Sequence, residues 1–136
     1  MGADKINTGH LNIINNAKKK GKVIIGLFSD KAIAEYKRLP LINYKSRLGI
    51  IENLKGIHKI IKQDTWDYTY NLKKIKPDFV AHGDDWKKGI QKKQRKKVIK
   101  TLKTWGGKIL EIKYTNNPQL SRVHKKFDNI YFNNVA

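Results

Sequence analysis

The sequence predicts an α/β protein in which a parallel β-sheet lies between layers of helices. Short apolar runs alternate with stretches of helical periodicity along most of the chain. The run Lys22–Phe28 is continuously apolar after its lysine and is bounded by Gly21 and by Ser29-Asp30, which is typical of a strand buried on both faces. Strands that alternate with helices at this spacing need crossover connections, so we expect them to be parallel.

The predicted strands are short apolar runs that end at glycine, proline or polar residues: 22–28, 57–61, 78–82 and 108–112. The predicted helices have apolar residues three and four positions apart and polar or glycine ends: 10–20, 31–36, 43–54, 70–76, 90–104 and 120–128. The 136 residues therefore predict one domain over 1–128 and a tail over 129–136.

The chain carries a formal charge of +19, which suggests an anionic partner. Of the 30 basic residues, 26 are lysine and only 4 are arginine, and asparagine (12) and isoleucine (18) are also abundant. Lysine, asparagine and isoleucine are the residues that AT-rich codons favour, and a nucleic-acid reader would use more arginine. We therefore interpret the charge mainly as codon bias, which still helps to attract an anionic substrate.

Composition also limits the class of protein. The chain has no cysteine, which excludes disulfides, thiolate metal sites and a cysteine nucleophile. Neither a signal peptide nor an apolar run as long as a membrane span is recognisable in the sequence. We expect a soluble, cytoplasmic protein that does not associate with membranes.

The segment Asn7-Thr8-Gly9-His10 stands where a loop turns into the helix 10–20. A helix N-terminus presents unpaired N–H groups and a partial positive charge, which favour a bound phosphate. Glycine allows close approach to the backbone, and histidine adds a hydrogen-bond donor. The segment therefore predicts a phosphate site, although a histidine at this position is also a common helix cap.

A second segment, His82–Lys87, reads His-Gly-Asp-Asp-Trp-Lys and follows the strand 78–82. Ligands of parallel sheets bind at the carboxyl ends of the strands, so this segment, the loop around Trp66 and the Asn7–His10 turn are expected at one edge. His82–Lys87 resembles the GDDW segment of the cytidylyltransferase-like nucleotidyltransferases, and Asn7–His10 resembles their HxGH turn. The pattern is closest to the cytidylyltransferases of phosphonate biosynthesis associated with phosphoenolpyruvate mutase, and is also similar to glycerol-3-phosphate cytidylyltransferase.

This resemblance implies a three-layer Rossmann-like nucleotidyltransferase fold. It also implies transfer of CMP from CTP to a small phosphonate or phosphoryl substrate, such as 2-aminoethylphosphonate, with release of pyrophosphate. Mg²⁺ would be the cofactor, without metal-ligating side chains assigned, and the family commonly forms homodimers. The implied catalytic residues are Asn7, His10 and Lys37, and the implied nucleotide-binding residues are Thr8, Gly9, His10, Arg47, Trp66, Gly83, Asp84, Asp85, Thr115 and Ser121.

The sequence departs from the family pattern in three places. Asn7 stands in place of the first motif histidine and cannot carry charge, which predicts a rate lower by on the order of 10²-fold. Gln119 and Leu120 replace two small hydroxyl residues of the family's last signature. Only six residues precede Asn7, which predicts that the first strand is truncated.

Other interpretations of these residues remain open. Trp66 can simply shield the sheet edge, and Asp84 and Asp85 can cap the helix that follows. The Lys-rich segment 90–104 can bind nucleic acid or a membrane surface, but Val98, Ile99, Leu102 and Trp105 form one apolar stripe that favours packing on the sheet. The functional alternatives are a catalytically silent nucleotide-binding domain and, less favoured, a basic nucleic-acid-binding protein.

Overall fold

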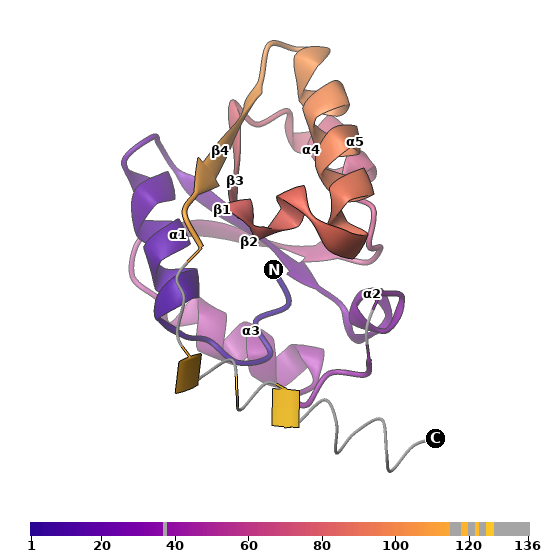
Figure 1. Cartoon of the computed structure of the whole chain (residues 1–136). Helices are drawn as coiled ribbons and strands as arrows, with labels where there is room; N and C mark the ends of the chain where they lie inside the picture. Colours follow the sequence, from indigo (N-terminus) through magenta and orange to yellow (C-terminus); the bar gives the residue numbers. More distant parts are fainter. Residues whose placement is uncertain (37, 115–117, 120–121, 123–124, 127–136) are drawn as a thin grey trace.

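The computed structural model describes residues 1–36, 38–114, 118–119, 122 and 125–126. Helices and strands alternate along the described chain, as Figure 1 shows. In order, the elements are α1 (Thr8–Lys18), β1 (Val23–Phe28), α2 (Asp30–Ala34), α3 (Tyr44–Glu52), β2 (Ile57–Gln63), α4 (Thr69–Ile75), β3 (Phe79–Gly83), the 3-10 turns η1 (Asp84–Lys87) and η2 (Gly89–Gln91), α5 (Lys92–Lys103) and β4 (Lys108–Ile112).

The strands form two parallel pairs. β1 lies beside β2 with Phe28 opposite Gln63, and β3 lies beside β4 with Gly83 opposite Ile112. The predicted α/β architecture with parallel strands is therefore confirmed. Among the described residues no ladder joins the two pairs into one sheet. Where a joining strand would lie, one residue pairs with β1: the amino group of Met1 donates to the Gly26 carbonyl at 2.8 Å, and the Met1 carbonyl accepts from the Phe28 N–H at 2.9 Å.

The buried side chains fall into separate clusters that follow this division. Alternate residues of β1 pack with Ile14 of α1 and Ile51 of α3 in the first cluster. On the other strand pair, Trp86 packs with Leu72 of α4 and with Leu102 of α5. Figure 1 shows α4 and α5 together beside β3 and β4, away from α1 and α3.

The segment 90–104 is a packed helix, as the apolar stripe predicted. Val98 and Leu102 are buried in the cluster around Trp86, while most of the lysines of α5 are exposed. No helix among the described residues is apolar over a stretch long enough to cross a bilayer. Of the predicted terminal helix 120–128 only three positions (122, 125 and 126) are described, and the predicted tail lies outside the described residues.

The prediction that the strand at 22–28 is buried on both faces is wrong at Ile24, whose side chain is 38% exposed. Val23, Ile25 and Leu27, which point to the opposite face, are buried. The exposure at Ile24 coincides with the edge of β1 that is unpaired among the described residues, apart from the contact with Met1. The face of β1 that carries Ile24 is therefore only partly covered at this position, which leaves an apolar strand residue in contact with water.

Candidate active site

The turn Asn7–His10 forms the start of α1, and its geometry is fixed by its own side chains. Asn7 is the N-cap: its Oδ1 accepts from the N–H of Gly9 at 2.9 Å, and its Nδ2 donates to the carbonyl of Lys5 at 3.0 Å. The ring Nδ1 of His10 accepts from the N–H of Asn7 at 3.2 Å. In the neutral imidazole the proton is consequently on Nε2, which makes that nitrogen a hydrogen-bond donor.

The segment after β3 forms a compact turn around an aromatic pair, in which Trp86 is buried and His82 is half-buried. The rings of His82 and Trp86 stack with centroids 3.9 Å apart and planes 4° apart. Nδ1 of His82 is 2.8 Å from the carbonyl oxygen of Gly83 and therefore donates to it. Burial lowers the pKa of His82, and the nearby carboxylate of Asp85 opposes this effect only in part. The ring of His82 is consequently held as a neutral support for the turn.

Gly83 lies between the carboxylate of Asp85 and the side chain of Ile13 in α1. A Cβ atom on Gly83 would lie 2.8 Å from Oδ1 of Asp85 and 3.8 Å from the side chain of Ile13 in α1. A larger residue would therefore push the Asp85 carboxylate out of its place. The missing side chain therefore leaves room for the Asp85 carboxylate beside the end of β3.

A cavity of about 910 Å³ brings most of the predicted site residues together. Its wall includes the Asn7–His10 turn, Trp66, Gly83 and Asp85. The predicted residues that line it are Asn7, Thr8, Gly9, His10, Trp66, Gly83 and Asp85. Lys20, Lys76 and Lys113 also line the cavity and give its wall positive charge. The cavity therefore combines a helix N-terminus with cations, which suits a polyphosphate ligand.

Asp84 and Arg47 do not line this cavity. Oδ1 of Asp84 accepts from the N–H of Tyr114 at 2.9 Å and so ties the chain after β4 to the end of β3. Lys37, Thr115 and Ser121 lie outside the described residues. The structure thus brings together seven of the predicted residues and gives Asp84 and Arg47 contacts within the chain.

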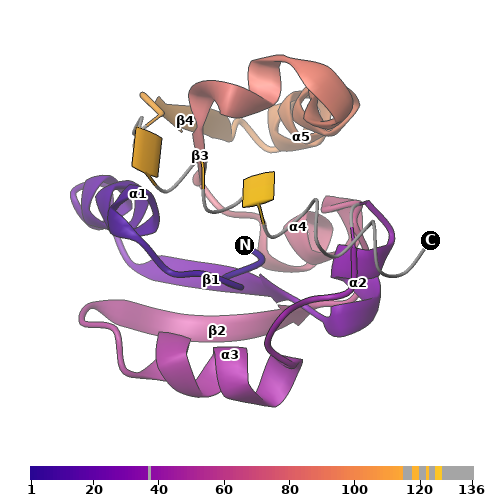
Figure 2. The same ribbon diagram turned by 60° about the horizontal axis from the view of Figure 1, so that its bottom comes forward.

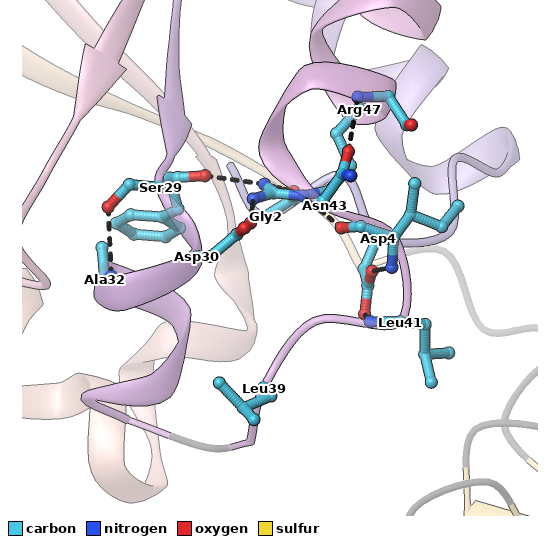
Figure 3. Close-up of polar contacts among 12 residues, drawn as sticks. Gly2, Asp4, Ser29, Asp30, Ala32, Leu39, Leu41, Asn43 and Arg47 are labelled. Carbon is cyan, nitrogen blue, oxygen red and sulfur yellow. Dashed lines mark hydrogen bonds and ion pairs between the residues drawn. The ribbon is translucent and has the colours of Figure 1, made fainter.

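Arg47 is fully buried and joins the N-terminal segment to β1 and α2 (Figure 3). Its guanidinium donates to the carbonyls of Gly2 at 2.7 Å and Phe28 at 2.6 Å, and it pairs with Asp30 at 2.6 Å. The predicted role of Arg47 was nucleotide binding. Its contacts instead favour a structural role, because they use the nitrogens that would have to reach a phosphate.

Asp4 holds the same N-terminal segment against the loop before α3 (Figure 3). Its carboxylate pairs with the buried Arg38 at 2.9 Å and accepts from the N–H groups of Leu41 and Ile42, each at 3.0 Å. Although burial raises the pKa of Asp4, these donors outweigh that effect and lower it. Asp4 is consequently an ionised anchor for the residues that lead into the Asn7–His10 turn.

An aromatic wall of four residues borders the cavity, and of these four only Trp66 was assigned to the site from the sequence. Tyr36 and Trp66 stack with centroids 4.0 Å apart and planes 21° apart, and Phe28 lies 5.7 Å from each of them. Tyr68 completes the cluster, and burial raises the pKa of Tyr36 to about 12. These residues come from the end of β1, the end of α2 and the loop after β2. Phe28, Tyr36 and Tyr68 are spread along the chain, and no local pattern marked them as neighbours of Trp66.

The loop that carries Trp66 is fixed by side-chain hydrogen bonds. Nε2 of the buried Gln63 donates to the carbonyls of Thr65 and Asp67, both at 2.9 Å. The N–H of Trp66 donates to the carboxylate of Glu35 at 2.9 Å. Trp66 is therefore presented to the cavity in a defined position.

No group of three or more histidine, cysteine, aspartate or glutamate residues within the described part of the chain is placed to hold a metal ion. The side chains around the cavity consequently do not form a protein cage for Mg²⁺. Mg²⁺ is commonly bound by one or two carboxylates together with the phosphates of a substrate, and Asp85 at the cavity fits that lesser role.

Comparison with known proteins identifies the family. The family model described as "Cytidylyltransferase-like" matches residues 3–129. The chain belongs to the cytidylyltransferase-like family. It is 30% identical to FAD synthase of Methanothermus fervidus over 142 aligned positions, which cover 97% of this chain and 94% of the relative. It is 28% identical to FAD synthase of Methanobrevibacter smithii, with 86% of this chain and 78% of the relative covered.

A solved structure supports the same fold. The lipopolysaccharide core biosynthesis protein from Thermoplasma volcanium GSS1 superposes with a TM-score of 0.71 at 22% identity, covering 85% of this chain and 93% of that one. Membership of the cytidylyltransferase-like family rests on the family model and is confirmed by it, whereas the solved structure shows the fold alone. The narrower resemblance to phosphonate cytidylyltransferases is not supported by these relatives, which carry the name FAD synthase.

Proposed function

We propose that this chain transfers a nucleotidyl group from a nucleoside triphosphate to a small phosphorylated acceptor and releases pyrophosphate. One observation carries the proposal: the N-terminus of α1, with His10 at its third position, lines the same cavity as Gly83 and Asp85. A phosphate-binding helix end and a turn at the carboxyl end of a parallel strand are the two parts that this reaction needs.

In this reaction an oxygen of the acceptor phosphate attacks the α-phosphorus of the triphosphate. The bond between the α-phosphorus and the oxygen that bridges to the β-phosphorus breaks, and pyrophosphate leaves with that electron pair. Negative charge accumulates on the five-coordinate phosphorus, where donors must stabilise it more strongly than in the ground state. The Nε2–H of His10 and the N–H groups that open α1 are proposed to supply this stabilisation.

Asn7 contributes geometry rather than charge in this proposal. Its side chain caps α1 and holds the turn, as its contacts with Gly9 and Lys5 indicate. A neutral amide cannot stabilise a developing charge as strongly as an imidazolium can. We therefore keep the prediction that this chain reacts more slowly than a form with histidine at position 7.

Two substrate pairs follow from different observations. The relatives named FAD synthase favour ATP with flavin mononucleotide, and the aromatic wall around Trp66 offers ring surfaces on which a planar acceptor can stack. The resemblance of His82–Lys87 to the GDDW segment favours CTP with 2-aminoethylphosphonate. Mg²⁺ is proposed to enter with the triphosphate, since it neutralises phosphate charge.

The test is pyrophosphate release with each pair in the presence of Mg²⁺, together with calorimetric titration of ATP and CTP. Turnover with either pair supports nucleotidyl transfer and selects the substrate. Binding of a nucleotide without turnover of any phosphorylated acceptor would instead identify a catalytically silent nucleotide-binding domain. If neither nucleotide binds and RNA or DNA does, with steep salt dependence, the proposal is wrong and the basic nucleic-acid-binding alternative holds.

A further inference from the structure

The exposed face of α5 is a continuous stripe of lysine. Seven of the twelve residues of this helix are basic and none is acidic. Four exposed lysines are spaced three and four positions apart, which places them on one side of the helix: Lys93, Lys96, Lys97 and Lys100. Val98 and Leu102 occupy the opposite side and are buried in the cluster around Trp86. Packing on the strands therefore uses one face of α5 and leaves the lysine stripe in contact with water.

A groove of about 540 Å³ lies along this lysine stripe. All four lysines of the stripe line it, and Ile90 of η2 and Trp66 of the loop after β2 add apolar surface. Ile90 is 67% exposed, so its side chain is available to a ligand. Trp66 is the one residue that also lines the 910 Å³ cavity. The groove is therefore a separate site, with cations on one side and apolar surface beside them.

Most of the positive charge of the groove is not neutralised. Lys97 pairs with Asp67 at 2.5 Å. Within the described part of the chain, Lys93, Lys96 and Lys100 have no carboxylate within ion-pair distance. Like charges three and four positions apart on a helix repel one another and destabilise it. A ligand that carries several negative charges would relieve this repulsion along α5.

The loop on the other side of the groove is fixed to α5 by side chains of that helix. The buried Gln94 donates from Nε2 to the carbonyl of Trp66, and its Oε1 accepts from the N–H of Tyr68 at 3.5 Å. The ion pair of Lys97 with Asp67 makes a second connection. The two sides of the groove are thus held together by the protein itself, which reduces the ordering that a ligand would have to impose.

The composition of the groove favours a chain of phosphates over a membrane or a protein partner. A helix that lies on a membrane needs an exposed apolar face, and the apolar face of α5 is buried. Protein interfaces are depleted in lysine, whereas lysine neutralises phosphates as a compact point charge. The one arginine of α5, Arg95, pairs with Glu111 at 2.7 Å and so is not free to read a base.

We propose that this groove binds single-stranded nucleic acid without sequence preference, as a site additional to the nucleotidyl-transfer cavity. Successive phosphates lie along Lys93, Lys96 and Lys100, which follow one another over roughly 10 Å of helix. A base packs on the apolar surface of Ile90 and Trp66. A row of cations beside apolar or aromatic side chains is the usual arrangement for binding single strands of any sequence.

The experiment measures fluorescence anisotropy of a labelled oligouridine of about twelve nucleotides with the full chain, at several NaCl concentrations and without nucleoside triphosphate. Three unpaired lysines predict that log K falls with log[NaCl] with a slope of about −2. Replacing them together by glutamine should weaken binding about tenfold or more at about 50 mM NaCl and remove most of the slope: Lys93→Gln, Lys96→Gln and Lys100→Gln. Ile90→Ser should weaken binding several-fold and leave the slope unchanged, because it removes only contact with a base.

Two matched triple variants remove the same charge elsewhere and should each change the affinity by less than about twofold. The first is on α3, β2 and the loop between them, and Figures 1 and 2 show α3 on the opposite side of the molecule from α5. Its substitutions are Lys45→Gln, Lys55→Gln and Lys59→Gln. The second is in the 910 Å³ cavity and consists of Lys20→Gln, Lys76→Gln and Lys113→Gln.

Loss of binding confined to the groove variants supports the proposal. Equal loss in the α3 variant overturns it, because the field of the whole protein then attracts the strand. Loss confined to the cavity variant also overturns it, since the strand would then occupy that cavity. The proposal is equally wrong if duplex RNA, inorganic polyphosphate or phosphatidylglycerol vesicles bind as tightly as the single strand, or if oligouridine does not bind.

Thermal unfolding separates lost binding from lost structure. The groove triple variant should have a Tm equal to or above that of the original chain, because it relieves repulsion along α5. Since none of these measurements uses a nucleoside triphosphate or turnover, they stand or fall separately from the nucleotidyl-transfer assay.

Discussion

The ring of His10 has one nitrogen committed to the backbone of Asn7, and this fixes which nitrogen carries the proton. If the Nε2–H of His10 stabilises the reacting phosphate, His10→Ala should lower kcat by about 10²-fold or more. His58→Ala is the matched control, because His58 is exposed on β2 and lies away from the cavity wall. Steady-state pyrophosphate release measures both variants. Equal rates for His10→Ala and the original chain would remove His10 from the chemistry.

Asn7 caps α1 and has a side chain that cannot carry charge, and a substitution can separate these two properties. Asn7→His introduces a side chain that can carry charge at the phosphate site, and we expect kcat to rise. The same change removes the cap on the N–H of Gly9, which should lower the free energy of unfolding by about 1 kcal/mol. Kinetics and chemical denaturation measure the two effects. A variant with unchanged kcat would show that Asn7 does not limit the reaction.

The neutral state of His82 predicts how stability depends on pH. Burial lowers the pKa of His82 in the folded protein, in the presence of Asp85, Glu111 and the N-terminal ammonium. Because the unfolded chain binds this proton more readily, the stabilisation is present above about pH 6.5 and is lost as the pH falls through the folded pKa. Thermal unfolding from pH 8 to pH 5 should show this loss, and His82→Gln should reduce it. His58→Gln should leave the profile unchanged, whereas an unchanged profile in His82→Gln would contradict the assignment.

At the scale of elements, Arg47 connects α3 to three other segments. Its removal leaves the carbonyls of Gly2 and Phe28 without their donor and Asp30 without its ion pair, so Arg47→Met should cost about 3 kcal/mol of stability. Lys45→Met on the exposed face of the same helix should change stability little. Urea denaturation measures both variants. A stable Arg47→Met protein with a raised KM for nucleotide would instead support the predicted contact with nucleotide.

The elements of this fold could be predicted because their causes are local. The apolar spacing within 43–54 and the apolar stripe through Val98 and Leu102 are short-range patterns, and the structure has helices where they predict them. Arg47 could not be placed in this way, because a charged residue is usually exposed and its partners are backbone carbonyls from distant segments. Within the aromatic wall only Trp66 was predicted to belong to the site, and Tyr36 was missed because it meets Trp66 only in the folded chain.

At the scale of the whole molecule, the position of the Asn7–His10 turn depends on how the first six residues are held between the two strand pairs. Met1 lies beside β1, where it exchanges backbone hydrogen bonds with Gly26 and Phe28. The site keeps its turn because Arg47 and Asp4 hold residues 1–6 through side-chain contacts. The homodimer that the resemblance implies remains a prediction, and sedimentation equilibrium would contradict it by giving the mass of a monomer.

The charge of +19 raises the question of whether the triphosphate is attracted by the cations of the cavity wall or by the field of the whole protein. If cations on the cavity wall attract the triphosphate, kcat/KM should fall several-fold from about 50 to about 500 mM NaCl, with little change in kcat. Replacing three of the five lysines that line the cavity by glutamine should lower kcat/KM and weaken its salt dependence: Lys20→Gln, Lys76→Gln and Lys113→Gln. The matched control removes the same charge from exposed positions on α3, β2 and the loop between them: Lys45→Gln, Lys55→Gln and Lys59→Gln.

Comparison of the two triple variants assigns the origin of the attraction. If kcat/KM falls only in the cavity variant, the lysines of the cavity wall guide the substrate, as expected for a site that holds phosphate. Equal losses in both variants mean that the field of the whole protein acts, since each variant loses the same charge. An unchanged kcat/KM in both variants, at every salt concentration, would show that the lysine excess does not contribute to substrate capture and reflects codon composition alone.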